Sequence, residues 1–86
     1  MADDNPRWAD GLEISETEEG LEVLDPASGR RHELNLTAAL VFELCSGERS
    51  VESIVAVVQE AYELAWPPTD EVRACLDELL HEGVVV

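Results

Sequence analysis

The sequence has 86 residues, of which 45% are apolar and 5% aromatic, and its 20 acidic and 5 basic side chains give a formal charge of -15. This length allows one domain with one core, and the apolar share is enough to build that core without a disulfide or a metal. The charge opposes contact with nucleic-acid phosphates and anionic lipids. It favours a neutral or basic partner, although acidic side chains can also serve solubility alone.

The sequence carries no recognisable targeting signal. No apolar run reaches the roughly 18 residues that a transmembrane helix needs. The opening segment, MADDNPRWADG, lacks the basic and apolar regions of a signal peptide. We therefore predict a cytoplasmic protein. In that reducing compartment Cys45 and Cys75 are expected to be free core thiols, because both lie in apolar helical patterns.

Residues 1–11 contain Pro, Gly and three Asp without periodicity, which predicts a disordered N-terminal tail. Trp8 is expected to rest on the surface of the domain that residues 12–86 form. The next segments, LEISET, GLEVLDP and RRHELNL, alternate in polarity and predict three short antiparallel strands joined by Gly-containing turns. Arg31 and Glu33 would face solvent. The alternation places these side chains on the opposite face: Leu12, Ile14, Leu21, Val23, His32, Leu34 and Leu36.

Three helices are predicted to follow the strands. Their apolar residues recur at helical spacing in LTAALVFELCSG, VESIVAVVQEAYEL and TDEVRACLDELLHEG. The expected N-caps are Asn35 or Thr37, then Ser50, then Thr69. Trp66, in the loop before the third helix, is expected to pack on the core, with packing against a binding groove as the alternative. Three strands followed by three helices predict a small α+β domain, in which the first two helices resemble a helix-turn-helix.

The sequence contains no constellation of residues that is typical of catalysis. His32 and His81 do not form close pairs with each other or with the two cysteines, so no metal site is predicted. The five glycines are isolated, which excludes a glycine-rich phosphate loop, and we predict no catalytic residue and no cofactor. A small sheet with an open edge and a helix beside it is instead typical of a module that binds a peptide as an added strand. The edge predicted for this role is RRHEL, with the third helix as the opposite wall.

The sequence resembles the PqqD family, the small domains that recognise precursor peptides in ribosomal natural-product pathways. The resemblance runs from about Leu12 to Val86, and these residues carry it: Leu34, Asn35, Thr37 and Ala38, then Leu44, Cys45, Gly47, Ser50, Val51 and Ile54, and finally Leu76, Leu79 and Gly83. It implies a winged helix-turn-helix-like fold, a three-stranded antiparallel sheet followed by three helices. It also implies a non-catalytic RiPP recognition element, a peptide chaperone that binds the leader segment of a precursor as a strand added to its third strand. The bound precursor would be delivered to a modifying enzyme, either a radical S-adenosylmethionine (SAM) maturase or the leader peptidase of a lasso-peptide system.

The resemblance also implies a peptide-binding groove with two walls. The residues that line it would be Arg30, Arg31, His32, Glu33 and Leu34 on the third strand, and Val72, Arg73, Leu76, Asp77 and Leu80 on the third helix. An acidic winged-helix regulatory or DNA-binding protein is the alternative, since the order of elements is the same. Against it, the chain has no lysine and its third helix carries Arg73 as its one arginine, whereas DNA binding neutralises several phosphates. A subunit of a composite enzyme, with the chemistry supplied by a partner, is a third hypothesis.

Overall fold

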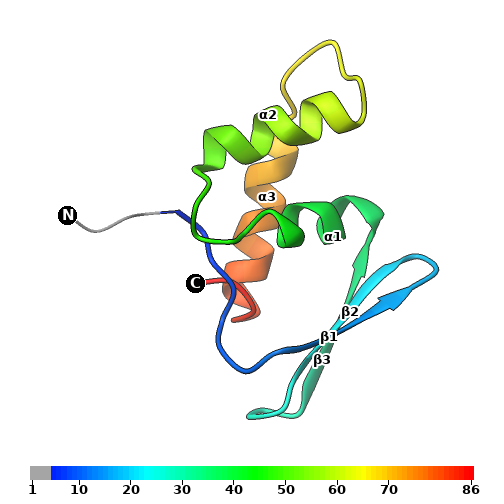
Figure 1. Cartoon of the computed structure of the whole chain (residues 1–86), viewed down its shortest axis with the longest axis vertical. Coiled ribbons are helices and arrows are strands. Elements are labelled where there is room, and N and C mark those ends of the chain that lie inside the picture. The colour runs from blue at the N-terminus through cyan, green and yellow to red at the C-terminus, as the bar shows by residue number, and fades with distance from the viewer. Residues whose placement is uncertain (1–4) are drawn as a thin grey trace.

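The computed structural model of the protein describes residues 5–86 (Figure 1). Three strands come first: β1 (Glu13–Thr17), β2 (Gly20–Asp25) and β3 (Arg30–Asn35). Three helices follow: α1 (Leu36–Glu43), α2 (Val51–Ala61) and α3 (Thr69–His81). This order confirms the α+β architecture that the sequence predicts.

The strands form an antiparallel sheet in the order β1-β2-β3, so β1 and β3 are both edge strands. Two glycine positions shape it. Gly29 closes the turn between β2 and β3, where its N–H donates to the Asp25 carbonyl at 2.8 Å. Gly20 has a φ of 152°, and a Cβ atom at this position would overlap the backbone oxygen of Leu34. The close approach of β2 and β3 therefore requires glycine here.

Local capping starts two of the helices as predicted. The Asn35 side chain accepts a hydrogen bond from the Ala38 N–H at 2.9 Å, and Ser50 does the same for Ser53 at 3.1 Å. The prediction for the third helix was wrong, because Thr69 is its first residue and Pro68, the N-cap, makes no side-chain capping bond. Proline fixes φ and cannot donate a backbone hydrogen bond, so it starts the helix without a polar cap.

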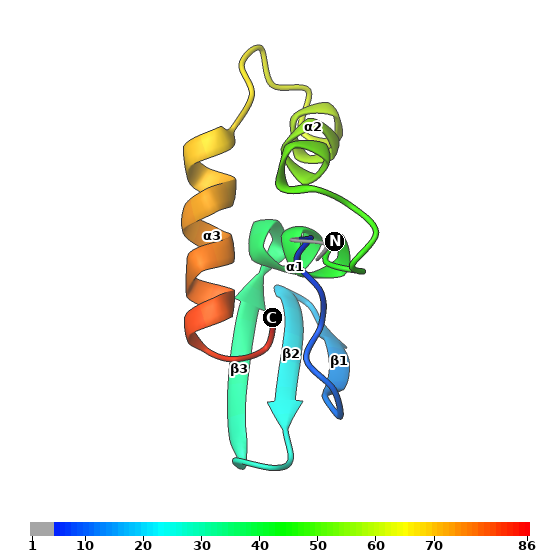
Figure 2. The ribbon, with the colours of Figure 1, turned by 90° about the vertical axis from the view of Figure 1, so that its left-hand side faces the viewer.

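The core lies between the three helices and one face of the sheet, with α3 beside β3 (Figure 2). Its buried apolar side chains are Leu21, Val23, Leu34, Ala39, Val41, Phe42, Cys45, Ile54, Val55, Val58, Val72, Leu76, Leu79, Val84 and Val85. Three residues expected on the inner face or against this core are exposed. Ile14 on β1 is 49% exposed, Leu36 begins α1 instead of continuing the strand pattern, and Trp66 is 81% exposed.

Backbone hydrogen bonds join Arg7 and Ala9 to the last residues of the chain. The Arg7 N–H donates to the Val86 carbonyl at 3.0 Å, and the Val86 N–H donates to the Arg7 carbonyl at 2.7 Å. Trp8 rests on the domain as expected, with its indole Nε1 donating to the Phe42 carbonyl at 2.6 Å. These bonds join segments that are far apart in the sequence, so no local sequence pattern predicts them. The first four residues of the predicted tail lie outside the described residues.

Within residues 5–86, none of the helices combines the length and the apolar character that crossing a membrane requires.

Candidate functional site: the open edge of strand β3

The register of the sheet fixes which backbone groups face outward. Thr17 pairs with Gly20 across a two-residue turn, and such a closing pair exchanges backbone hydrogen bonds. Bonded and non-bonded pairs alternate along an antiparallel ladder. The even-numbered residues of β2 therefore bond to β1, and its odd-numbered residues bond to β3.

The same alternation continues into β3. The odd-numbered Val23 pairs with His32, so the even-numbered residues of β3 direct their backbone groups toward β2. Arg31 and Glu33 consequently direct their N–H and C=O groups away from the sheet. The described part of the chain gives these groups no backbone partner outside the sheet. Strand β3 thus offers an incomplete ladder at its outer edge.

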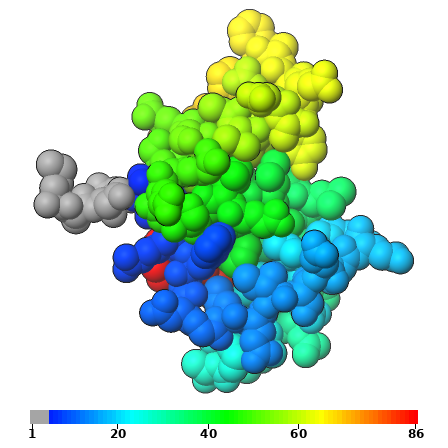
Figure 3. Space-filling view, viewed as in Figure 1, coloured from blue at the N-terminus to red at the C-terminus, as the bar shows by residue number. Residues whose placement is uncertain are grey.

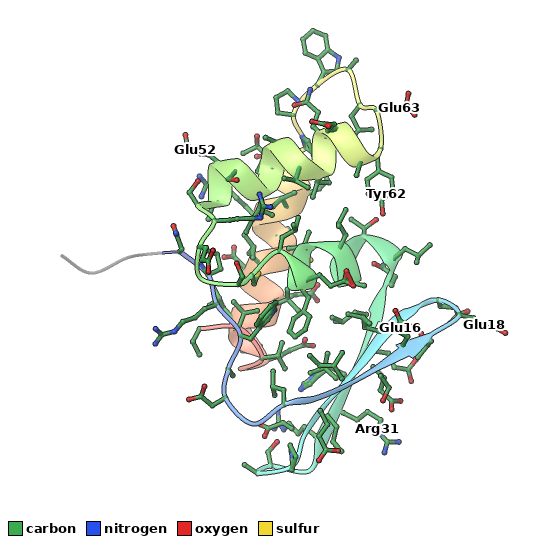
Figure 4. The ribbon with its side chains drawn as sticks, viewed as in Figure 1. Glu16, Glu18, Arg31, Glu52, Tyr62 and Glu63 are labelled. Carbon is green, nitrogen blue, oxygen red and sulfur yellow. The ribbon has the colours of Figure 1, made fainter. Side chains whose placement is uncertain are left out.

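The side chains of β3 divide between the two faces of the sheet. Leu34 is buried in the core, and His32 lies beside it on the inner face with 10% of its side chain exposed. On the outer face Arg31 lies 3.6 Å from the carboxylate of Glu22 (Figure 4). Arg30 is exposed, and within residues 5–86 it forms no ion pair. The edge is therefore fixed from the inside by the core, while its two arginines remain available to solvent.

One contact identifies the side of α3 that borders β3. His32 Nδ1 lies 3.6 Å from an oxygen of Glu82, the residue after α3, and His32 Nε2 is buried without a hydrogen-bond partner. Side chains three or four residues apart share a helix face. Cys75 and Glu78 therefore lie on the same side of α3 as Glu82, and the part of α3 that borders β3 carries acidic side chains.

The predicted α3 wall lies largely elsewhere. Four of its members line a cavity of about 310 Å³ whose other walls are Pro6, Val51 and Val86 and which includes no β3 residue; they are Arg73, Leu76, Asp77 and Leu80. Val72 is buried and lines a different cavity, between α1, α2 and α3. The structure thus keeps Arg30, Arg31, His32, Glu33 and Leu34 together on one strand, and it does not bring the predicted helix residues to that strand.

A helical apolar stripe explains this difference, because it has two borders. The residues Arg73 and Leu80 lie at one border, and Cys75 and Glu82 lie at the other. Periodicity in the sequence identifies both borders but does not say which one adjoins the sheet. The position of Glu78 and Glu82 on the β3 side was not predicted for this reason, and the His32–Glu82 contact identifies that side in the described part of the chain.

Neither thiol has the properties of a nucleophile. Burial, with a smaller contribution from Cys75, raises the pKa of Cys45 to about 12. Burial also raises the pKa of Cys75, and the neighbouring carboxylates of Glu78 and Glu82 add to that rise. Both thiols are therefore protonated near neutral pH, whereas the thiolate is the reactive form. Among the described residues, no group of three or more metal-ligating side chains is positioned to hold an ion.

Comparison with known families decides the identity of this fold. The model of the family described as coenzyme PQQ synthesis protein D (PqqD) matches residues 21–85. The chain belongs to the PqqD family. The matched segment runs from β2 to the end of the chain and contains the β3 edge and all three helices.

A solved structure confirms the fold of this PqqD-family chain. The structure described as "Lasso peptide synthetase B1 complexed with the leader peptide" superimposes with a TM-score of 0.79. The alignment covers 95% of this chain and 98% of the other, at 23% sequence identity. No curated protein matched the sequence.

Proposed function

We propose that this protein binds the leader segment of a ribosomally synthesised precursor peptide, as a strand added to β3. In this proposal it catalyses no reaction and delivers the precursor to a modifying enzyme, either a radical SAM maturase or a lasso-peptide leader peptidase. The observation that carries the proposal is the open ladder of Arg31 and Glu33 in a chain of the PqqD family. The similar fold of a lasso peptide synthetase B1 that was solved with a leader peptide supports it.

Strand addition suits the geometry of β3. A peptide lying beside Arg31 and Glu33 would complete backbone hydrogen bonds that do not depend on its sequence. Its side chains would alternate between the outer face of the sheet and the acidic side of α3, so that specificity comes from every second residue. We propose Arg30, Arg31, His32, Glu33 and Leu34 as the strand wall of the site.

Contacts within the protein anchor β3 without a bound peptide. Leu34 is buried, and the Asn35 side chain fixes the point where β3 passes into α1. Binding therefore does not have to order β3, and the entropic cost of ordering arises mainly from the peptide. A dissociation constant in the roughly nanomolar to micromolar range is expected for such an augmented strand.

The charge distribution makes the DNA-binding alternative the weaker one. Helix α2 contains no arginine or lysine, and α3 contains one arginine, Arg73. Specific DNA binding neutralises several phosphates, and a formal charge of -15 would repel them. A peptide carries far less negative charge per unit length, so the same acidity is tolerable there.

Fluorescence anisotropy with synthetic peptides tests the binding step. The leader and core halves of the precursor encoded beside the gene would be labelled separately and titrated with the full chain. We expect saturable binding of the leader half and at least tenfold weaker binding of the core half. Equal affinity for both halves, or no binding of either, would contradict the proposal.

Hydrogen exchange tests the binding mode separately. On addition of the leader, the amides of Arg31 and Glu33 should become protected, because they acquire partners in the added strand. The outward amides of the other edge, at Ile14 and Glu16, should exchange at an unchanged rate. Binding without protection of Arg31 and Glu33 would show that the peptide lies elsewhere.

A further inference from the structure

A cavity of about 590 Å³ lies away from the sheet, between the start of α1, the end of α2 and the start of α3. Its floor is apolar and buried, and consists of Val58, Pro68 and Val72. The loop between α2 and α3 forms its rim, and in the space-filling view this loop projects beyond the rest of the molecule (Figure 3). The rim contains three large apolar side chains that are exposed to solvent: Tyr62, Leu64 and Trp66.

The rim has a defined conformation. At the end of α2 the Glu63 N–H donates to the Glu60 carbonyl at 3.2 Å, and the Leu64 N–H donates to the Gln59 carbonyl at 2.9 Å. These two bonds form a Schellman motif, in which the residue with positive φ is commonly glycine. Here that residue is Glu63, with a φ of 52°. The Gln59 side chain also donates to the Leu64 carbonyl at 3.2 Å, which holds the turn from the helix side.

This conformation leaves apolar surface in water. In a Schellman motif the residue after the turn commonly packs back on the helix, yet Leu64 is 41% exposed. Exposed tryptophan and tyrosine beside a hollow are typical of protein interfaces, where they supply a large contact area with little loss of side-chain entropy. The Tyr62 hydroxyl reaches 3.5 Å from Thr37 Oγ1 at the start of α1, across the mouth of the cavity (Figure 4).

The surroundings of the cavity carry charge of one sign. Residues 58–72 include no lysine, arginine or histidine, and they include four carboxylates: Glu60, Glu63, Asp70 and Glu71. In the described part of the chain none of these four is in an ion pair, and Glu71 lines the cavity itself. An apolar hollow with an acidic surround is complementary to an apolar side chain flanked by basic residues.

We infer that this cavity is a second binding site, which takes a basic segment of a partner protein that inserts one aromatic or large aliphatic side chain beside Trp66. The site is separate from the proposed leader site because no β3 residue lines it. A second copy of this chain is a poor occupant, since two molecules of formal charge -15 repel each other. The inference does not depend on leader binding.

Short synthetic peptides provide the test. The first probe is an acetylated, amidated pentapeptide with a central Phe and two Lys on each side. One control replaces the four Lys with Glu, and the other replaces the Phe with Ala. The readout is the indole N–H signal of Trp66 in nuclear magnetic resonance spectra of a Trp8→Phe variant, in which Trp66 is the single remaining tryptophan.

The Lys-flanked Phe peptide should shift the Trp66 signal in a saturable manner, and each control peptide should bind at least tenfold more weakly. Added salt should weaken the binding because exposed charges are screened. Trp66→Ala should abolish binding without unfolding, since this side chain is 81% exposed. Because this variant lacks the Trp66 signal, its binding is measured by fluorescence anisotropy of the labelled peptide. Circular dichroism would verify the fold of each variant.

Two glutamates, Glu71 on α3 and Glu52 on α2, provide a matched pair of charge reversals. Glu71→Lys, inside the cavity, should weaken binding of the Lys-flanked peptide at least fivefold. Glu52→Lys makes the same change of charge at the opposite end of α2 (Figure 4), and it should weaken binding no more than twofold. Equal effects of the two substitutions would show attraction to the net charge alone and would overturn the inference.

The leader peptide provides the remaining outcome. If a leader that binds this protein also shifts the Trp66 signal and competes with the Lys-flanked peptide, the cavity is part of the leader site and the inference of a separate partner fails. If the leader leaves Trp66 unchanged while the pentapeptide binds, the two sites are independent. Leader binding itself is measured by anisotropy, so failure of one proposal is distinguishable from failure of the other.

Discussion

The sheet has two open edges that differ in how they are held. Strand β1 packs against β2 alone among the helices and strands, and all five of its residues are exposed. Strand β3 packs against β2 and α1, buries Leu34 and leaves 10% of the His32 side chain exposed, and His32 contacts Glu82 at the end of α3. Both strands have unpaired backbone groups, but only β3 is fixed to the core.

This difference indicates that an open edge needs a suitable charge, as well as anchoring to the core, in order to bind a peptide strand. Any edge strand can accept another strand, and proteins commonly protect such edges with charge. Strand β1 has this protection, since Glu13 and Glu16 lie on it and Glu18 and Glu19 form the adjoining turn (Figure 4). Strand β3 carries two of the five basic residues of the chain, Arg30 and Arg31, so its edge carries less negative charge than the edge of β1.

The largest effect is expected from Gly20→Ala, which breaks the attachment of β3 to the sheet. The added Cβ would overlap the backbone oxygen of Leu34, and the φ of 152° is unfavourable for alanine. We expect a loss of about 3 kcal/mol or more in the free energy of unfolding. Urea denaturation followed by circular dichroism measures it, and a loss below about 1 kcal/mol would show that β3 does not depend on this close approach.

The next comparison truncates one inner-face residue on each edge. Leu34→Ala removes a buried side chain from β3 and should cost about 3 kcal/mol of stability. Ile14→Ala removes a side chain from β1 that is 49% exposed, and should cost about 1 kcal/mol or less. The same denaturation experiment compares them. Equal losses would mean that the two edges are anchored alike.

Proline substitution separates the edges by function. Glu33→Pro removes an outward N–H from β3, and Glu16→Pro removes one from β1; both residues are exposed glutamates on edge strands. Leader affinity should fall at least tenfold for Glu33→Pro, about 1.4 kcal/mol, and remain unchanged for Glu16→Pro. Leu34→Pro would be uninformative because the N–H of Leu34 is directed toward β2. A loss of leader binding in Glu16→Pro alone would move the peptide to β1.

The sequence alone predicts the features that depend on residues close together in the chain. Polarity alternation locates all three strands, and the Asn35 and Ser50 side chains predict their caps because capping involves residues two or three positions apart. The strand wall of the candidate site follows from the same alternation. What could not be predicted depends on contacts between distant segments: the pairing of Arg7 with Val86, and the side of α3 that adjoins β3. The exposure of Trp66 could not be predicted either, because the burial of a loop residue depends on how the helices before and after the loop pack together.

The smallest effect is expected on leader affinity when a positive charge is removed from the β3 edge. Arg30 is exposed and is not in an ion pair within residues 5–86, so Arg30→Gln removes attraction for a leader carboxylate without disturbing an internal contact of its side chain. We expect a two- to fivefold loss of leader affinity, because an exposed charge pair contributes about 0.5–1 kcal/mol. Arg49→Gln makes the same change of net charge before α2 and is the matched control, for which affinity should remain unchanged. Since the effect is electrostatic, it should shrink as salt is raised. Equal affinities of the two variants at low salt would show that the arginines of β3 do not attract the leader, and would leave the anchoring of the strand as the one property that distinguishes the two edges.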